Sequence, residues 1–361
     1  IDGFRMDVIS VISKRNYNDT PYDSFNDTIN NIYANGPKIH DYLKEMNREV
    51  MSKYDMMTVG EGPGISLETG LDYVDSTRKE LDMVFHFDHM FIDHGPGGKF
   101  DIVPFDFVDF KNIFAKWDVL LENKGWGSVF LGNHDFPRIV SRFGNDGEYR
   151  EESAKLLATM LLSLRGTTYI YQGDEIGMTN VAFDHIEDYR DVETHNAYRE
   201  EVLDKGRDPA DFLKAVHYQG RDNVRTPMQW SDEENAGFTN GEPWIKVNPN
   251  FKDINVATQQ GDEDSVLSFY KRMVAFRKEN LTLVYGEFEM IDPQNKDLFI
   301  YERSDSNGKF LVFLNFTDNE LTYQYKGIES LSPAIGNYEE VRMDADHLML
   351  KPWESIIFKI S

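Results

Sequence analysis

The sequence contains no cysteine, and it has few basic residues for its size. Its 361 residues include 38 Lys and Arg against 63 Asp and Glu, which gives a formal net charge of −25. The absence of cysteine excludes disulfides and thiolate metal sites. The shortage of positive charge argues against nucleic acid and anionic membranes as partners, because both require basic patches. These absences exclude partners but identify no substrate.

The sequence also lacks an initiator Met, a signal peptide and any apolar run close to the roughly 18 residues of a membrane span. Together with the absence of cysteine, this predicts a cytoplasmic protein with no membrane partner. The first residues, IDGFRMDVIS, have the pattern of a buried strand that nevertheless carries Asp2, Arg5 and Asp7. We therefore expect the chain to begin inside a longer protein.

Strand-like and helical patterns alternate through roughly the first 280 residues. The strand-like runs are GFRMDVIS (3–10), MMTVGE (56–61), DMVFHFD (82–88), SVFLGNHD (128–135) and TTYIYQGDE (167–175). Helical periodicity occurs at 37–54, 110–123, 150–165 and 264–280, and Pro37 is expected at the first position of its helix. On that first helix, Ile39, Tyr42, Leu43 and Met46 are predicted to share one face. The alternation predicts an α/β fold with a parallel sheet.

The pattern changes after about residue 286, where short alternating strands are joined by polar turns. This predicts two domains, a catalytic domain at 1–285 and an antiparallel β domain at 286–361. Residues 183–262 are polar and rich in Asn, Asp and Gly, which is typical of a long functional loop or lid. Trp230 and Trp244 are expected to pack this loop rather than to stack on sugar.

Carboxylates lie at the ends of several predicted strands. Asp7, Glu61 and Asp135 each end such a run, and His134 precedes Asp135. A lone Asp after a strand is more often a turn former or helix cap, so the joint pattern carries the argument. In a β/α barrel the carboxyl ends of the strands converge on one active site. Two convergent carboxylates, one nucleophile or base and one acid, are the requirement of glycoside hydrolysis.

A second cluster of polar residues contains the residue types of a metal site, but the spacing between these residues does not match one. The cluster is the run HFDHMFIDHG at 86–95, with His86, Asp88, His89, Asp93 and His94. It lacks the i, i+4 histidine pair of helical zinc sites. On a strand, His86 and Asp88 would share a face and His89 would point away. We predict no metal here and interpret the run as a polar strand end with its loop.

Five blocks of the sequence resemble the signatures of the α-amylase family of glycoside hydrolases, in its oligo-1,6-glucosidase branch. The blocks are GFRMDVI, VGEGPG, GNHDFPRIVSRFG, YIYQGDEIGMTN and GRDNVRTPMQW. The resemblance covers essentially the whole chain. It implies an α/β fold that comprises the C-terminal part of a (β/α)8 TIM barrel, strands 4 to 8, followed by a small antiparallel β domain.

The resemblance also implies a role for each strand-end residue. Asp7 would be the nucleophile, Glu61 the general acid/base and Asp135 the transition-state stabiliser. Three further residues would contact the sugar in the −1 subsite: Arg5, His134 and Arg221, with Arg225 as an alternative to Arg221 in the same block. Val8, directly after the nucleophile, goes with α-1,6 cleavage in similar sequences, whereas Thr or Ala goes with α-1,4.

The implied function is that of a retaining α-glucosidase that releases glucose from the non-reducing end of short isomalto-oligosaccharides. Alternatives within the family are an α-1,4-glucosidase, a trehalose-6-phosphate hydrolase and a sucrose isomerase, and a more remote one is a non-catalytic amylase-like subunit. No cofactor is expected, and calcium would bind only to a preceding N-terminal part. The full-length protein is expected to be a monomer with a small oligosaccharide as its partner.

Two features depart from the family's pattern. Phe136 replaces a Gln in the fourth signature, and Gly62 follows the acid/base where a larger residue is usual; both positions border the +1 site in such enzymes.

The resemblance also bears on where the chain begins. Family members have three β/α units before GFRMDVI, at least roughly 90 residues by the size of such units. We therefore expect the chain to be a fragment that is inactive by itself, because an open barrel leaves edges and core exposed.

Overall fold

The computed structural model describes residues 1–17 and 25–360. These residues form two compact units, the first made of 1–129 with 165–168 and the second of 130–164 with 169–361. This division lies inside the predicted catalytic domain, and the predicted boundary between residues 285 and 286 stays a prediction. The two units are described in turn.

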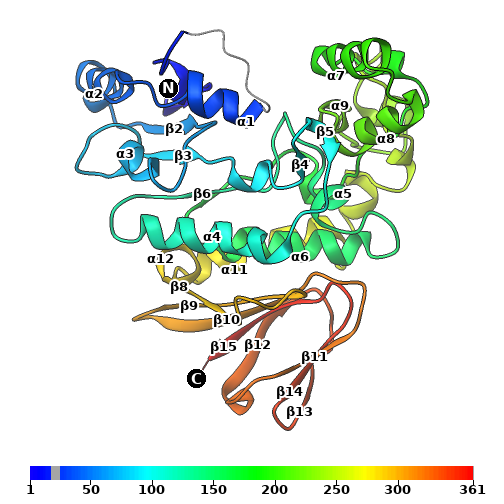
Figure 1. Cartoon of the computed structure of the whole chain (residues 1–361). Coiled ribbons are helices and arrows are strands. Elements are labelled where there is room, and N and C mark those ends of the chain that lie inside the picture. Colours follow the sequence, from blue (N-terminus) through cyan, green and yellow to red (C-terminus); the bar gives the residue numbers. More distant parts are fainter. Residues whose placement is uncertain (18–24, 361) are drawn as a thin grey trace. The chain divides into compact units, whose positions relative to one another are not determined.

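The first unit is built on parallel strands. Within its described residues these strands are β1 (Gly3–Met6), β2 (Met57–Glu61), β3 (Met83–Phe85), β6 (Ser128–Val129) and β7 (Thr167–Thr168). Strands β1, β2 and β3 pair in that order, and β6 pairs with β7; β2 and β3 lie side by side in Figure 1. The Ser128 hydroxyl in β6 donates to the carbonyl of Val84 in β3 at 2.6 Å, and this bond links the pair β6-β7 to the sheet β1-β2-β3. All the predicted parallel strands are present, although each is shorter than its sequence run.

Helices follow the strands of this unit and cover them. They are α1 (Phe25–Thr28), α2 (Ile39–Glu49), α3 (Gly70–Val74) and α4 (Phe107–Leu121), with 3-10 helical turns at Ile9–Val11, Met51–Lys53 and Asp88–Met90, a π-helix at Ile29–Tyr33 and a hairpin of β4 (His94–Gly95) and β5 (Gly98–Ile102). Ile39 and Leu43 of α2 enter the same core as Trp117 of α4. The predicted face of α2 was partly wrong, because Tyr42 is exposed. Pro37 lies outside the helix, which begins at Ile39.

Helices also dominate the second unit before its C-terminal strands. They are α5 (Ile139–Phe143), α6 (Arg150–Ser163), α7 (Val192–Tyr198), α8 (Pro209–Gln219), α9 (Asp222–Arg225), α10 (Val256–Gln259), α11 (Val266–Glu279) and α12 (Thr282–Tyr285), with 3-10 helical turns at Asp174–Ile176, Ile186–Asp188, Glu234–Gly237, Pro249–Lys252 and Ile328–Ser330 and a π-helix at Arg199–Asp204. The prediction of one long loop at 183–262 was therefore wrong, because this stretch contains α7 to α10. The start of α8 shows why a helix forms in this polar stretch. Asp208 caps the backbone N–H groups of Ala210 and Asp211, and Pro209 takes the first helical position.

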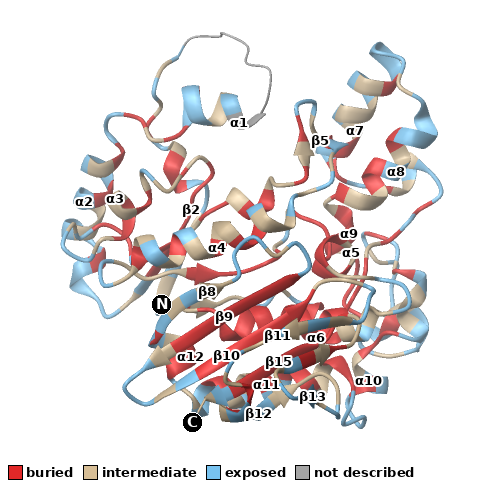
Figure 2. Ribbon diagram, turned by 60° about the horizontal axis from the view of Figure 1, so that its bottom comes forward, coloured by how far each residue is buried: buried red, intermediate tan, exposed pale blue. Residues whose placement is uncertain are grey.

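The C-terminal strands form two antiparallel sheets. The larger has the order β12-β15-β10-β9-β8 and the smaller β11-β14-β13. The strands are β8 (Glu287–Ile291), β9 (Leu298–Asp305), β10 (Gly308–Asn315), β11 (Leu321–Gln324), β12 (Leu331–Gly336), β13 (Arg342–Asp344), β14 (His347–Leu350) and β15 (Ser355–Ile360). Figure 2 shows buried residues along β9 and β10, and Ile300, Leu311 and Phe313 of these strands belong to one core cluster. The predicted antiparallel β region is confirmed. Among the described residues, no helix has the length and apolarity needed to cross a membrane.

Candidate active site

In the first unit, two of the predicted carboxylates share one guanidinium. Arg5 pairs with Val59 across β1 and β2, so the carboxyl ends of these neighbouring strands lie together. Arg5 donates through Nη1 to the Asp7 carboxylate, and its Nη2 lies 2.6 Å from Glu61 Oε1. Because both nitrogens belong to one planar group, the nearest oxygens of the two carboxylates lie well inside the roughly 9.5 Å that bounds glycosidase pairs.

The two carboxylates differ strongly in their exposure to solvent. The side chain of Asp7 is 76% exposed, whereas that of Glu61 is 7% exposed. Glu61 Oε2 also accepts the backbone N–H of Val8 at 3.0 Å. Val8 adopts a left-handed conformation, with φ 35° and ψ 44°, which is rare for a β-branched residue. Such strain occurs mainly at functional sites, and here it turns the chain after Asp7 toward Glu61.

Packing accounts for both departures from the family's pattern. A Cβ on Gly62 would lie 2.4 Å from Cδ1 of the buried Ile65, so Ile65 already fills the space of a larger side chain. In the second unit, Phe136 is buried with the guanidinium carbon of Arg142 5.3 Å from its ring centre. Phe136 therefore acts as a packing residue in this structure, and its expected place at the border of the +1 site stays a prediction.

In the second unit, Asp135 accepts hydrogen bonds from two guanidiniums. Its Oδ1 accepts from Arg225 Nη2 at 2.7 Å and from Arg221 Nη1 at 3.3 Å, and its Oδ2 lies 3.2 Å from His134 Nε2. Arg225 Nε also donates to the carbonyl of His134 at 2.9 Å. The sequence led us to Arg221 with Arg225 as the alternative. Both residues reach Asp135, because the i, i+4 spacing across α9 places them on one face.

A buried arginine holds the backbone of α9 in place. The guanidinium of Arg138 is fully buried and donates to the carbonyls of Gln172, Asn223 and Val224 at 2.6, 3.2 and 3.3 Å. Burial lowers the pKa of Arg138, while the nearby charge of Asp174 acts to raise it. Burial has the opposite effect on the acidic Asp174, because it disfavours the charged form of both groups: it raises the pKa of Asp174 to about 7, and the positive charge of Arg138 opposes this rise. These side chains form the support of the Asp135 site.

The histidine-rich run at 86–95 is integrated into the core of the first unit. His86 stacks on Trp117 with ring centres 4.3 Å apart, and Asp88 accepts the Trp117 indole N–H at 2.7 Å. Strand β3 ends at Phe85 and a 3-10 turn begins at Asp88, so the expected shared strand face of His86 and Asp88 was wrong. Within residues 1–17 and 25–360, no group of three or more His, Asp or Glu has a metal-binding arrangement.

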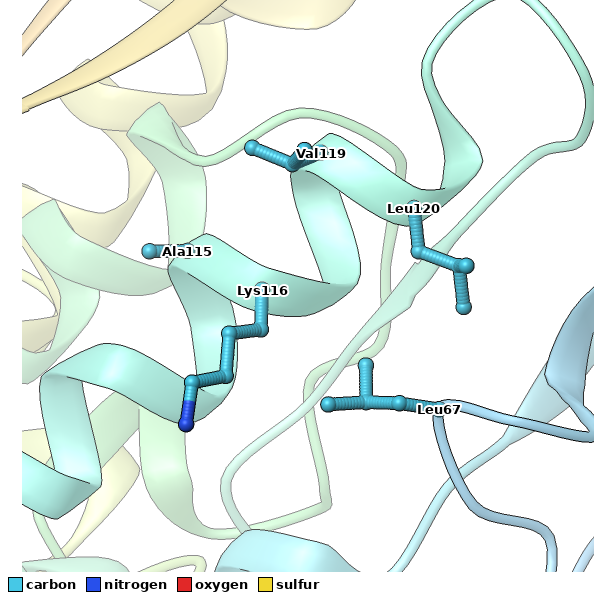
Figure 3. A pocket seen from close by; sticks show the side chains of 5 residues that line it. All are labelled: Leu67, Ala115, Lys116, Val119 and Leu120. Atoms are coloured by element: carbon cyan, nitrogen blue, oxygen red, sulfur yellow. The ribbon is translucent and has the colours of Figure 1, made fainter.

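Two further features bear on ligand binding. Trp230 and Trp244 are 50% and 67% exposed, so the prediction that they pack their loop was wrong. A shallow hollow of about 400 Å³ lies on α4 of the first unit, lined by Leu67, Ala115, Lys116, Val119 and Leu120 (Figure 3). Its lining is almost entirely apolar and includes no predicted site residue. It lacks the hydrogen-bonding groups that a sugar requires, so it is not the candidate active site.

Comparison with known proteins places these residues in a family. Residues 1–286 match the model "Alpha amylase, catalytic domain". An oligo-1,6-glucosidase of Parageobacillus thermoglucosidasius is 48% identical over 374 residues, and the match covers all of this chain and 65% of that protein. A trehalose-6-phosphate hydrolase of Bacillus subtilis is 40% identical over 370 residues, covering all of this chain and 64% of that protein.

Solved structures agree with these sequence relatives. A crystal structure of Bacillus licheniformis trehalose-6-phosphate hydrolase is 41% identical with a TM-score of 0.91, and it is matched over 100% of this chain and 65% of that one. A trehalulose synthase structure is 38% identical with a TM-score of 0.93, over 100% and 66%. The chain thus spans about two thirds of its relatives' length, and the predicted TIM-barrel fold class is confirmed. On this evidence, the chain belongs to the α-amylase family of glycoside hydrolases.

Proposed function

We propose that this chain carries the catalytic groups of a retaining α-glucosidase that hydrolyses α-1,6 bonds of short isomalto-oligosaccharides. The observation that carries the proposal is the pair of carboxylates, Asp7 and Glu61, on adjacent strand ends and bonded to one guanidinium, that of Arg5. Support also comes from relatives that are 41–48% identical and are named oligo-1,6-glucosidases.

Each carboxylate has a distinct part in the proposed reaction. Asp7, which is open to solvent, attacks the anomeric carbon of the sugar, while Glu61 gives its proton to the leaving oxygen. The glycosidic bond breaks and a covalent glucosyl-Asp7 ester forms. Glu61 then removes a proton from a water molecule, which attacks the same carbon and releases Asp7. Two inversions leave the product with the α configuration of the substrate.

The second unit carries a cluster of its own, for which we propose roles in the same reaction. Asp135 would stabilise the positive charge that develops on the sugar ring in the transition state. Arg221, Arg225 and His134 would hold sugar hydroxyls, because each presents donors next to the Asp135 carboxylate. Sugar contact by these residues is a proposal. We also propose that the full-length enzyme is a cytoplasmic monomer and that its reaction uses no cofactor or metal.

A trehalose-6-phosphate hydrolase is the second candidate, since such enzymes from Bacillus subtilis and Escherichia coli are 40% identical to this chain. The test uses the protein expressed from its complete reading frame. Hydrolysis of isomaltose, maltose and trehalose 6-phosphate is measured, and proton NMR identifies the glucose anomer released first. We expect isomaltose to be preferred and α-glucose to appear first. Early β-glucose would contradict the retaining mechanism, and preference for trehalose 6-phosphate would select the second candidate.

A further inference from the structure

A buried carboxylate, Asp191, lies against the guanidinium of Arg221 in the second unit. We propose that Asp191 is a positioning residue that aims Arg221 at Asp135. This inference rests on the proposed function, because it concerns the site in which Asp135 would act. It adds a role for a residue of the 183–262 stretch, which the sequence alone presented as a polar loop.

Asp191 is itself fixed by its own helix. It caps the N-terminus of α7, where its Oδ1 accepts the N–H of Glu193 and its Oδ2 accepts the hydroxyl of Thr194, both at 3.2 Å. The side chain is buried. Asx caps of this kind hold both carboxylate oxygens in a defined plane, so the orientation that Asp191 presents to α9 is set by the start of α7.

Asp222, at the start of α9, fixes the backbone of Asp191. The Asp222 side chain is fully buried, and its Oδ2 accepts the N–H groups of Arg190 and Asp191 at 2.5 and 3.1 Å. Helices α7, α8 and α9 lie together in this part of the second unit (Figure 1). Asp222 therefore connects the segment that carries Asp191 to the segment that carries Arg221, over 31 positions of sequence.

Arg221 binds Asp191 with two nitrogens and Asp135 with the third. Its Nε donates to Asp191 Oδ2 at 3.0 Å and its Nη2 donates to Asp191 Oδ1, while its Nη1 reaches Asp135 Oδ1 at 3.3 Å. The hydrogen bond to Asp191 is the main cause that raises the pKa of Arg221 above its ordinary value. A bidentate pair fixes the plane of the guanidinium, so the direction of Nη1 follows from the position of Asp191.

Other contacts at this site depend less on Asp191. Glu193 approaches Arg221 Nε at 3.2 Å, but its side chain is 43% exposed, so it orients the guanidinium less firmly than the buried Asp191 does. Arg225 reaches Asp135 with support from the carbonyl of His134. Replacing Asp191 should therefore loosen Arg221 while Arg225 stays in place, and this selectivity makes the proposal testable.

The test is Asp191→Asn in the protein expressed from its complete reading frame. Asn preserves the helix cap but loses the charged two-point contact. We expect kcat on p-nitrophenyl α-D-glucopyranoside to fall roughly 10- to 100-fold, the usual cost of a small misplacement in an active site, with KM changed less than threefold. The matched control is Asp208→Asn at the cap of α8, which should leave kcat within twofold of wild type.

A double variant separates positioning from a general structural role. If Asp191 acts through Arg221, Asp191→Asn should cost less than threefold in an Arg221→Lys background, because coupled residues are not additive. An equal loss in both backgrounds, or a loss no greater than that of Asp208→Asn, would overturn the proposal.

Crystal structures provide a measurement that does not depend on activity. In Asp191→Asn we expect Arg221 Nη1 to leave Asp135 Oδ1, while Arg225 keeps its contact. An unchanged Arg221 would overturn the positioning role even if the wild-type enzyme hydrolyses α-glucosides. Absence of wild-type activity on every α-glucoside tested would instead refute the proposed function, and the crystallographic comparison would still decide the role of Asp191.

Discussion

Around Glu61 one guanidinium bonds two carboxylates, whereas around Asp135 one carboxylate accepts from two guanidiniums. In the first case the loss of Arg5 would bring like charges together without their shared counter-ion. In the second case the loss of one arginine would leave another in contact with Asp135. The comparison teaches that two ionic contacts in one cluster can matter more to its site than two in another. The contribution of a contact depends on which partners the charged groups keep after that contact is removed.

The largest effect is expected from the carboxylates of the first unit. Asp7→Asn removes the proposed nucleophile and Glu61→Gln the proposed proton donor, so kcat on p-nitrophenyl α-D-glucopyranoside should fall roughly 10³- to 10⁵-fold in either variant. Asp2→Asn, an exposed carboxylate before the same strand, is the control and should behave like wild type. If either Asp7→Asn or Glu61→Gln retained a tenth of wild-type kcat, its assigned role would be wrong.

The arginines test the comparison directly. Arg5→Gln should lower kcat/KM roughly 10²- to 10³-fold, because Asp7 and Glu61 lose their common counter-ion. Arg225→Gln should lower it only about tenfold, since Arg221 continues to donate to Asp135. Arg48→Gln, at an exposed pair with Glu49, serves as the control. Equal losses in the Arg5 and Arg225 variants would show that the two arrangements do not differ in the way proposed.

The strand-end carboxylates could be placed from the sequence because side-chain chemistry and strand periodicity coincide there. Asp7 and Glu61 end runs of apolar residues, and parallel strands bring such ends together. The sequence could not distinguish Arg221 from Arg225, because four residues is one helical turn and both side chains reach the same carboxylate. The role proposed for Asp191 was equally hidden, since it depends on contacts about 30 positions away in sequence.

Parts of the fold escaped prediction for related reasons. The helices within 183–262 are short, and their polar surfaces obscure the apolar periodicity, although the Asp208-Pro209 cap was visible in the sequence. Strands β12, β13 and β14 have only three to six residues, and β12 contains Pro333 and a bulge against β15. The exposure of Trp230 and Trp244 depends on tertiary packing, which composition does not report.

The support of the second unit should also depend on pH. The pKa of Asp174 is raised to about 7 by burial, so between about pH 4 and 7 the folded chain retains a proton that the unfolded chain releases. The free energy of unfolding should therefore decrease as pH rises through this window, by on the order of a few kcal/mol. Urea unfolding of the chain at pH 5, 6, 7 and 8 measures this decrease.

Asp174→Asn should flatten the pH dependence, because the amide has no proton to lose. Relative to wild type, the variant should gain stability from pH 5 to about 7 and level off toward pH 8, whereas the exposed carboxylate variant Asp232→Asn should keep the wild-type slope. Parallel curves for wild type and Asp174→Asn would show that Asp174 does not titrate in this window. The predicted pH dependence would then have to come from other groups.

The smallest effect concerns linkage preference and the strained residue between the two carboxylates of the first unit. Val8 is partly exposed, has a left-handed backbone, and donates its N–H to Glu61. Its side chain is stiff and wholly apolar. Thr has nearly the same shape but adds a hydroxyl that can bond an acceptor sugar. An α-1,6 link adds a rotatable CH₂ and moves the acceptor ring, so the contact required at this position differs between linkages.

Val8→Thr should therefore shift the ratio of kcat/KM for isomaltose over maltose toward maltose by about tenfold, because one such contact contributes roughly 1–3 kcal/mol. Thr retains β-branching, so the backbone strain at this residue stays nearly constant and the comparison isolates the hydroxyl. Val192→Thr, at an exposed valine of α7, is the control and should leave the ratio unchanged. If wild type prefers maltose, or if Val8→Thr leaves the ratio unmoved, the α-1,6 assignment fails while the α-glucosidase proposal, which depends on Asp7 and Glu61, stands.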